Sequence, residues 1–403
     1  MRILVNTQIS SYDLDGNPLI DSDSSWNLTQ GYANALAEAF PGKYDFLFIV
    51  PGRPFLAPTI GSDWEVWEDE HIPKDAFQAR FDFGFATRNA AVYYKPDIIF
   101  ECDPCKVLNW KYTCPGVPVV CYNSWIETPI YPKTKNYSLM WRQAEGSNFA
   151  EATLCNSLEA KRQIMHASQY SGTFLPEKSV HTVPPLVDER PWDHIRKFEG
   201  WPGETVKLMY NHRISEFKYY KDAWEAAIRM TNECATEHPD ITFVLYVSNP
   251  SGKRLNPMQI DKPRNVRIVG QGDSLDRDAY TNRLHMMDIV LTTFQNDNGG
   301  CWSMSMAEAM LAGCGIIAPD HGGYKETVGP NFPHYHLTDL VNNRFSLMES
   351  NRIAREHYMR YYSSFETVRK LHDVLTKVHS GEIKCLDLPN TCLLYTSPSP
   401  RDS

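Results

Sequence analysis

The chain has 403 residues, of which 42% are hydrophobic and 22% charged, a globular composition with room for two domains. Its formal net charge of −9 at pH 7 argues against nucleic-acid binding driven by the charge of the whole chain. A local basic groove is still compatible with this net charge. No run of eighteen apolar residues occurs, so the sequence predicts no transmembrane segment.

The chain begins with a strand pattern, RILVN at residues 2–6, and no long apolar stretch follows it. We therefore expect no secretory signal and a cytoplasmic protein. The ten cysteines are scattered, and Cys121 and Cys155 in apolar strand patterns are typical of small buried hydrophobes. Cys102 and Cys105 form a close pair without a second pair at zinc spacing, which favours free thiols and no metal site.

Short apolar runs alternate with helical patterns through most of the chain. The first half has strand patterns at residues 2–6, 44–50, 97–102, 117–123, 152–157 and 179–185, with helix patterns at 28–40 and 157–168. The second half has strand patterns at 206–211, 241–248, 266–270, 288–294 and 315–319, with helix patterns at 221–235, 277–287 and 303–313. Helix patterns at 337–362 and 364–381 follow.

Continuous apolar strands that alternate with amphipathic helices indicate parallel sheets covered on both faces. The sequence thus predicts an α/β protein with two Rossmann-like, doubly wound domains facing a central cleft, because the strands are too many for one small sheet. The boundary is expected near residues 184–204, which are rich in Pro, Trp and charge. The predicted units are residues 1–190, 191–340, C-terminal helices at 341–385 that return to the first domain, and a tail at 386–403.

The tail ends in LLYTSPSPRDS, which is polar and rich in Pro and Ser. It resembles translated read-through of a sequencing adapter more than protein. We therefore expect a non-native or disordered segment, which leaves the natural C-terminus open.

Two cations follow a predicted strand at the start of the second domain. Arg213 and Lys218 lie in the loop between the strand pattern at 206–211 and the next helix. Ligands of open α/β sheets bind beyond the carboxyl ends of the strands, and a guanidinium and an ammonium suit a diphosphate. The alternative is that Arg213 and Lys218 are surface cations of a solvated loop. Their position directly after a predicted strand favours a role in binding.

The stretch NDNGGCWSMSMAEAM, residues 296–310, runs from a glycine-rich loop into a helix pattern. The glycines allow a ligand close to the backbone, and a helix N-terminus suits phosphate. Glu308 lies in an apolar part of this helix, where an idle carboxylate is improbable, and it can accept two hydrogen bonds from a ribose diol. Another strand pattern is followed by Gly322, Gly323 and Glu326. The sequence does not decide whether these residues form a plain strand-to-helix loop or bind a ligand.

Residues 298–328, NGGCWSMSMAEAMLAGCGIIAPDHGGYKETV, resemble the C-terminal signature of family 4 (group 1) of the GT-B glycosyltransferases. NHRISEFK at 211–218 is similar to the segment that opens the same domain in that family. ATLCNSLEAKRQI at 152–164 and VHTVPPLVD at 180–188 are similar to the segments that close its first domain. The resemblance is strong in the second half and weak before residue 145.

The resemblance implies a GT-B fold, with an N-terminal acceptor domain and a C-terminal nucleotide-sugar donor domain. It implies a hexosyltransferase that is retaining, independent of metal and without a cofactor. Arg213 and Lys218 would hold the donor pyrophosphate and Glu308 the nucleotide ribose. The other donor-side residues implied are Gln271, Gly299, Gly300, Cys301, Trp302, Ser303 and Met304.

Two positions depart from the family pattern. Gly300 replaces the first glutamate of a pair, so the double-glutamate motif is degenerate, and Asp297 is the candidate to substitute for that glutamate as a catalytic group. In the N-terminal domain, Asn123, Trp125 and Glu127 occupy the acceptor-side loop where the family often has a histidine. Both departures concern the sugar and the reacting bond.

These departures keep a second hypothesis open, a non-catalytic protein that binds a nucleotide sugar. A minor alternative is a viral-type glycosyltransferase acting on a modified DNA base, which the acidic net charge does not favour. An epimerase of the same fold would need more paired carboxylates than the sequence offers. The acceptor, whether glycan, lipid, protein or modified nucleic acid, is left open.

Overall fold

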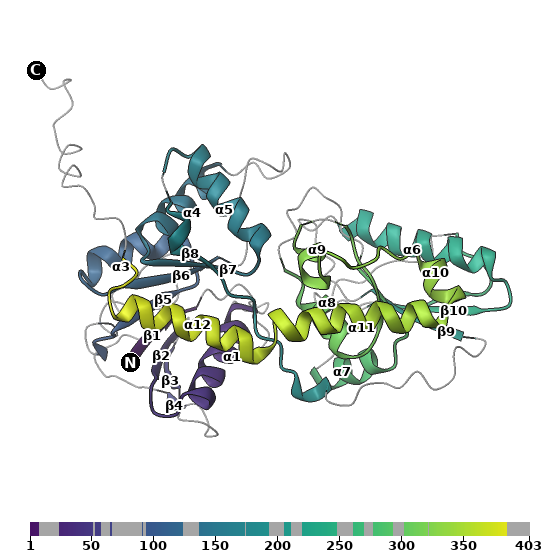
Figure 1. The fold of residues 1–403 in the computed structure, drawn as a ribbon, viewed down its shortest axis with the longest axis horizontal. Coiled ribbons are helices and arrows are strands. Elements are labelled where there is room, and N and C mark those ends of the chain that lie inside the picture. Colours follow the sequence, from purple (N-terminus) through teal and green to yellow (C-terminus); the bar gives the residue numbers. More distant parts are fainter. Residues whose placement is uncertain are drawn as a thin grey trace, which may run out of the picture.

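The computed structural model describes residues 1–7, 24–50, 53–57, 65–66, 91, 94–123, 137–173, 175–192, 205–210, 220–247, 261–269, 277–292, 302–320 and 322–384. They form two α/β lobes that lie side by side, each built on one sheet (Figure 1). The first lobe contains the N-terminal sheet and the second lobe the C-terminal sheet.

The sheet of the first lobe has eight strands in the order β4-β3-β2-β1-β5-β6-β7-β8. They are β1 (Arg2–Asn6), β2 (Asp45–Val50), β3 (Arg53–Ala57), β4 (Glu65–Val66), β5 (Ile98–Glu101), β6 (Val119–Asn123), β7 (Ala152–Cys155) and β8 (Val180–Thr182). The six strands predicted from the sequence are confirmed, and they pair in parallel. The unpredicted β3 and β4 extend one edge as antiparallel strands.

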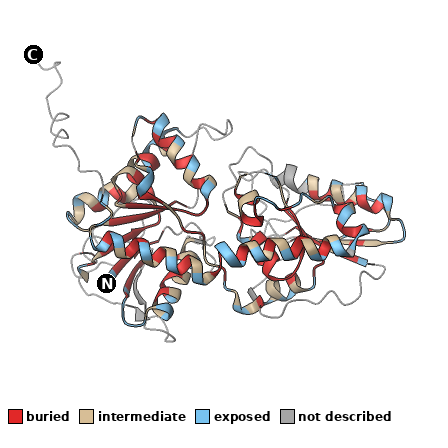
Figure 2. Ribbon diagram, in the orientation of Figure 1, coloured by how far each residue is buried: buried red, intermediate tan, exposed pale blue. Residues whose placement is uncertain are grey.

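Helices cover both faces of this sheet. They are α1 (Ser24–Ala39), α3 (Val107–Thr113), α4 (Tyr137–Phe149) and α5 (Leu158–Tyr170), with short 3-10 turns η2 (Pro104–Lys106) and η3 (Glu177–Ser179). Side chains alternate across a strand, so Ile3 packs in the core beneath α1 whereas Leu4 packs with Trp110 of α3. Figure 2 shows the strands as buried between helices with exposed outer faces.

The sheet of the second lobe has five parallel strands in the order β11-β10-β9-β12-β13. They are β9 (Thr205–Tyr210), β10 (Thr242–Val247), β11 (Val266–Val269), β12 (Ile289–Leu291) and β13 (Gly315–Ile317). The helices are α6 (Tyr220–Glu237), α7 (Arg277–His285), α8 (Met304–Leu311), α9 (Gly322–Val328), α10 (Leu337–Asn342) and α11 (Arg344–Tyr361), with η4 (Arg190–Trp192) before β9. This strand order, with helices on both faces, confirms the predicted doubly wound fold.

The helix pattern at 337–362 is two helices rather than one. Asn343 adopts an extended backbone between α10 and α11, and its side chain accepts a hydrogen bond from the backbone N–H of Phe345. Asparagine caps helices well because its short side chain replaces the missing backbone acceptor. The cap ends α10 and starts α11 in a new direction.

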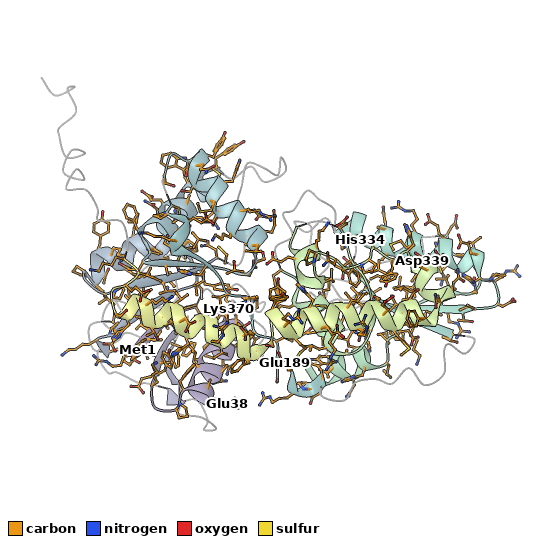
Figure 3. All side chains as sticks on the ribbon, in the orientation of Figure 1. Met1, Glu38, Glu189, His334, Asp339 and Lys370 are labelled. Carbon is orange, nitrogen blue, oxygen red and sulfur yellow. The ribbon has the colours of Figure 1, made fainter. Side chains whose placement is uncertain are left out.

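The chain crosses from the second lobe to the first between α11 and α12 (Ser364–His379). α11 packs on the second lobe, whereas Leu371 and Leu375 of α12 are buried in the core of the first. At the crossing, the backbone N–H of Ser364 donates to the carboxylate of Glu189. Glu189 belongs to the earlier connection, which leads from the first lobe to the second. Figure 3 labels Glu189 and Lys370 beside this crossing. Within the described ranges, no helix is long and apolar enough to span a membrane.

Candidate functional site

Many candidate residues lie outside the described residues. They are Arg213, Lys218, Gln271, Asp297, Gly299, Gly300, Cys301, Trp125 and Glu127. Those that the structure describes are Asn123, Trp302, Ser303, Met304 and Glu308, together with Glu326.

Helix α8 is a short, almost wholly buried helix. Ser303 caps its N-terminus, and the Ser303 hydroxyl accepts a hydrogen bond from the N–H of Met306. Met304, the first helical residue, is partly exposed. Gly313 ends the helix with a φ of 81°, a left-handed conformation that glycine adopts without strain. In the sequence, Trp302 and this N-cap directly follow the segment that contains Gly299 and Gly300.

The other end of α8 is fixed by polar side chains of α11. The Asn351 amide donates to the carbonyls of Met310 and Cys314, and the Arg355 guanidinium donates to the carbonyl of Leu311. Met310 and Leu311 lie in the last turn of α8, where carbonyls lack partners within the helix, so these side chains add donors to them; Cys314 lies just beyond the helix. α8 is thereby held rigidly on the second lobe.

Glu308 is buried within α8, with only 6% of its surface exposed. The phenol of Tyr280, on α7, donates a hydrogen bond to Glu308 Oε2 over 2.8 Å. Burying a carboxylate costs free energy unless hydrogen bonds compensate, so Glu308 is a built part of the fold rather than a solvated helix residue. The phenol also fixes the direction of the carboxylate.

Trp302 lies directly before the N-cap of α8 and packs against Tyr362. Their ring centroids are 4.7 Å apart at an interplanar angle of 63°, an edge-to-face contact. The buried indole Nε1 of Trp302 has no hydrogen-bond partner in the described part of the chain. Tyr362 directly follows α11, so Trp302 contacts the segment that crosses between the lobes.

Glu326, on α9 of the second lobe, reaches the first lobe. Its Oε1 accepts from the N–H of Leu158 over 2.8 Å, and its Oε2 accepts from the N–H of Glu159 over 3.2 Å. These are the first two N–H groups of α5, and Ser157 caps the third, that of Ala160. The sequence left a plain loop and a binding role open for Glu326; the structure instead places it in α9 and shows a contact between the lobes.

The carboxyl-end edge of the first sheet carries polar residues on neighbouring strands. Glu101 ends β5 and accepts hydrogen bonds from the Asn6 amide, the Trp110 indole and the backbone N–H of Asp103. Burial outweighs these bonds and raises the pKa of Glu101 to about 7. Asn123 ends β6, is fully buried and donates to the Ser147 hydroxyl, while its Oδ1 has no partner among the described residues.

Tyr280 and Tyr362 carried no signal in the sequence. Tyr280 lies in a helix with mostly polar neighbours, and Tyr362 follows a helix far along the chain. Their partners, Glu308 and Glu326, are 28 and 36 residues away, respectively. Only the folded chain brings these pairs together.

The two Rossmann-like α/β domains form the GT-B fold, the class that the strand order and the helical crossing define. Similar solved structures include HepE of Anabaena in complex with UDP and glucose, which is 12% identical with a TM-score of 0.60. The match covers 94% of this chain and 100% of HepE. Sucrose-phosphate synthase of Thermosynechococcus elongatus is 11% identical with a TM-score of 0.62, and 94% of this chain covers 99% of it.

A Listeria monocytogenes protein described as a UDP-N-acetylglucosamine 2-epimerase is similar as well, at 13% identity and a TM-score of 0.52, with 94% of this chain covering 97% of it. The sequence matches no protein-family model and no curated protein. At these identities the similarities establish the fold, and the chemistry has to be argued from the site.

Proposed function

We propose that the protein is a glycosyltransferase that moves a hexose from a nucleotide-sugar donor to an acceptor hydroxyl. The observation that carries this proposal is the buried carboxylate of Glu308, oriented by Tyr280, one turn inside a helix that begins beside a glycine-rich segment. Such a carboxylate suits the two hydroxyls of a ribose, and such a helix N-terminus suits a phosphate.

The GT-B fold supports a nucleotide-sugar donor. HepE, on the same fold, is solved with UDP-glucose as well as with UDP and glucose. In this chain Glu308 would bind the ribose, while Arg213, Lys218 and the N-terminus of α8 would bind the diphosphate. Gly299, Gly300, Cys301, Trp302, Ser303 and Met304 would line the donor side, with Gln271 near the base.

In the proposed reaction, the acceptor oxygen forms a bond to the anomeric carbon as the bond from that carbon to the diphosphate oxygen breaks. The acceptor proton leaves with the nucleoside diphosphate, and the configuration at the anomeric carbon is retained. Arg213, Lys218 and the helix N-terminus would stabilise the charge on the departing diphosphate without a metal ion. Asp297 would face the sugar in place of the glutamate that Gly300 replaces, and Asn123, Trp125 and Glu127 would lie on the acceptor side.

The test is binding and turnover with UDP-hexoses, followed by thermal shift and by release of UDP. A ligand that binds only the folded protein raises the melting temperature by mass action, so UDP is expected to stabilise the wild type. Glu308→Ala should weaken UDP binding at least about tenfold, the loss expected for a charge-assisted hydrogen-bonded pair. Glu356→Ala, a change of an exposed glutamate on α11, is the matched control.

The outcomes separate the candidate functions. UDP release that depends on an acceptor supports transfer. UDP binding without any release favours the nucleotide-sugar-binding protein, which Gly300 motivates, and conversion of the hexose without UDP release favours an epimerase. No stabilisation by any of UDP, GDP, ADP and TDP, alone or as sugars, would reject a nucleotide-sugar protein of any kind.

A further inference from the structure

The carboxylate of Glu326 joins the two lobes at a helix end. α5 follows β7 of the first sheet and α9 follows β13 of the second, and Glu326 is 167 and 168 residues from its partners Glu159 and Leu158. No N–H at the start of a helix has a partner within that helix. The first two N–H groups of α5 therefore have a partner from the second lobe.

Charge favours this contact as well as geometry. The N-terminus of a helix carries a partial positive charge, which a carboxylate complements. Burial raises the pKa of Glu326, whereas the N–H groups of Leu158 and Glu159 lower it. The first lobe thus supplies the donors that stabilise the ionised form, and separating the lobes removes them.

Tyr362 links this contact to the proposed donor side. Its hydroxyl lies 3.4 Å from Glu326 Oε1 and 3.3 Å from the Glu326 carbonyl oxygen, which also contacts His357 Nε2 at 3.0 Å. The same ring packs edge-to-face on Trp302, the residue before the N-cap of α8. A continuous set of contacts therefore runs from the start of α8 through Tyr362 to Glu326 and on to α5.

Tyr362 also lies where the chain leaves the second lobe. α12, which begins two residues later, is buried in the core of the first lobe. The ammonium of Lys370 on α12 lies 5.8 Å from the centre of the Tyr362 ring, within the range of a cation–π contact. Any rotation of one lobe against the other must therefore disturb the surroundings of Tyr362.

We propose that Glu326 is a positioning residue that holds the two lobes in a closed arrangement, and that Tyr362 couples this contact to the occupation of the donor side through Trp302. Closure would bring the acceptor side against the donor side. The coupling rests on the proposed function, because it assumes that a nucleotide binds at the start of α8. The contact between the lobes does not depend on that assumption.

Hydrogen exchange of the Leu158 and Glu159 amides reports the contact directly. These amides have no acceptor within α5, so their protection comes from Glu326. Mass spectrometry of a peptide that includes both amides should show at least about tenfold faster exchange in Glu326→Gln than in wild type, since a glutamine offers one oxygen and turns an NH₂ group toward the other donor. Glu356→Gln, which changes an exposed glutamate of α11, should leave the exchange as in wild type.

Addition of UDP tests the coupling. UDP should slow exchange at Leu158 and Glu159 in wild type and in Glu356→Gln. In Tyr362→Phe, which keeps the ring against Trp302 but removes the hydroxyl, UDP should still bind within about threefold while slowing these amides much less. In turnover, Glu326→Gln should lower kcat about tenfold or more with the donor KM within about threefold, since closure rather than nucleotide binding is weakened.

The two proposals fail in different ways. Equal exchange in wild type and Glu326→Gln would overturn the positioning role, whether or not UDP binds. An undiminished UDP effect in Tyr362→Phe would overturn the coupling. Absence of binding of any of UDP, GDP, ADP and TDP to the wild type would reject the proposed function and with it the coupling, and the exchange difference at α5 would still decide the role of Glu326.

Discussion

Tyr280 and Glu308 form a pair in which a phenol on α7 donates to a buried carboxylate on α8 over 2.8 Å. α7 precedes β12 in the chain and α8 follows it, and both pack in the same hydrophobic core cluster, so the pair joins two helices of one core. A carboxylate oriented in this way is ready for a ligand without the entropy cost of fixing it on binding.

Tyr280→Phe is expected to weaken UDP binding about three- to tenfold, or about 0.7–1.4 kcal/mol, because the carboxylate that binds the ligand loses the one hydrogen bond that orients it. The ring stays, so packing and melting temperature should change little. Isothermal titration with UDP measures the effect. Tyr112→Phe, on a tyrosine that is 81% exposed on α3, is the control, and equal affinity in all three proteins would contradict an orienting role for Tyr280.

Glu101 predicts a pH dependence of stability. Burial raises its pKa from 4.5 to about 7, so between these values the folded chain holds a proton that the unfolded chain has released. The contribution of this group to the free energy of unfolding must therefore fall as the pH rises from about 4.5 to about 7. Its full extent is about 3 kcal/mol, from the free energy that corresponds to one pKa unit.

The measurement is urea denaturation at several pH values, compared between wild type and Glu101→Gln. The variant is expected to be less stable, because its amide group faces the Trp110 and Asn6 donors, but its stability should lack this slope. Glu177→Gln, a change of an exposed glutamate, should keep the wild-type slope. Parallel pH profiles for wild type and Glu101→Gln would show that Glu101 does not titrate in this range.

The parallel strands were predictable because each is a short apolar run between helical patterns. β3 and β4 were not: β3 reads RPFLA and includes a proline, and both strands only extend an edge. α4 was missed because Gln143, Gly146 and Ser147 face inward while Trp141 is exposed, the reverse of the usual pattern. In both cases packing against neighbours decides the structure more than local preference does.

The candidate site was predictable as residue types in a motif but not as contacts. Glu308 stood out as a carboxylate in an apolar helix, and the structure adds the phenol that orients it. For Glu326 the motif left its role open, because its partners are backbone N–H groups of another lobe, which no side-chain pattern reveals. Tyr362 was invisible because its partners Trp302 and Glu326 lie far from it in the sequence.

Replacement by alanine should lower the free energy of unfolding by different amounts at Gly146 and Gly315. A Cβ at Gly146, in α4, would overlap the backbone carbonyl of Pro104, whereas a Cβ at Gly315, in β13, would meet the end of the Leu347 side chain. Alanine favours a helix by about 1 kcal/mol over glycine, but overpacking costs about 1–3 kcal/mol or more, so the clash decides at Gly146.

Gly146→Ala should thus lower the free energy of unfolding by about 3 kcal/mol or more, since a backbone carbonyl cannot rotate away. Gly315→Ala should cost about 1–2 kcal/mol, since Leu347 can change rotamer. Urea denaturation of both variants measures the difference. Equal losses, or a larger loss at Gly315, would contradict the close approach of α4 to Pro104.

Replacement of Asn351 should lower both the free energy of unfolding and the affinity for UDP. Its amide serves two carbonyls, of Met310 at 2.9 Å and Cys314 at 3.0 Å, and it is itself buried. Asn351→Ala leaves both carbonyls without this donor and should lower the free energy of unfolding by about 2–3 kcal/mol. Because those bonds hold the C-terminal end of α8, UDP affinity should fall as well, by about threefold or more. Asn343→Ala is the control, because it removes only the cap of α11; it should cost about 1 kcal/mol and leave UDP affinity unchanged. If the two variants had equal effects on UDP affinity, α8 would not depend on its contact with α11.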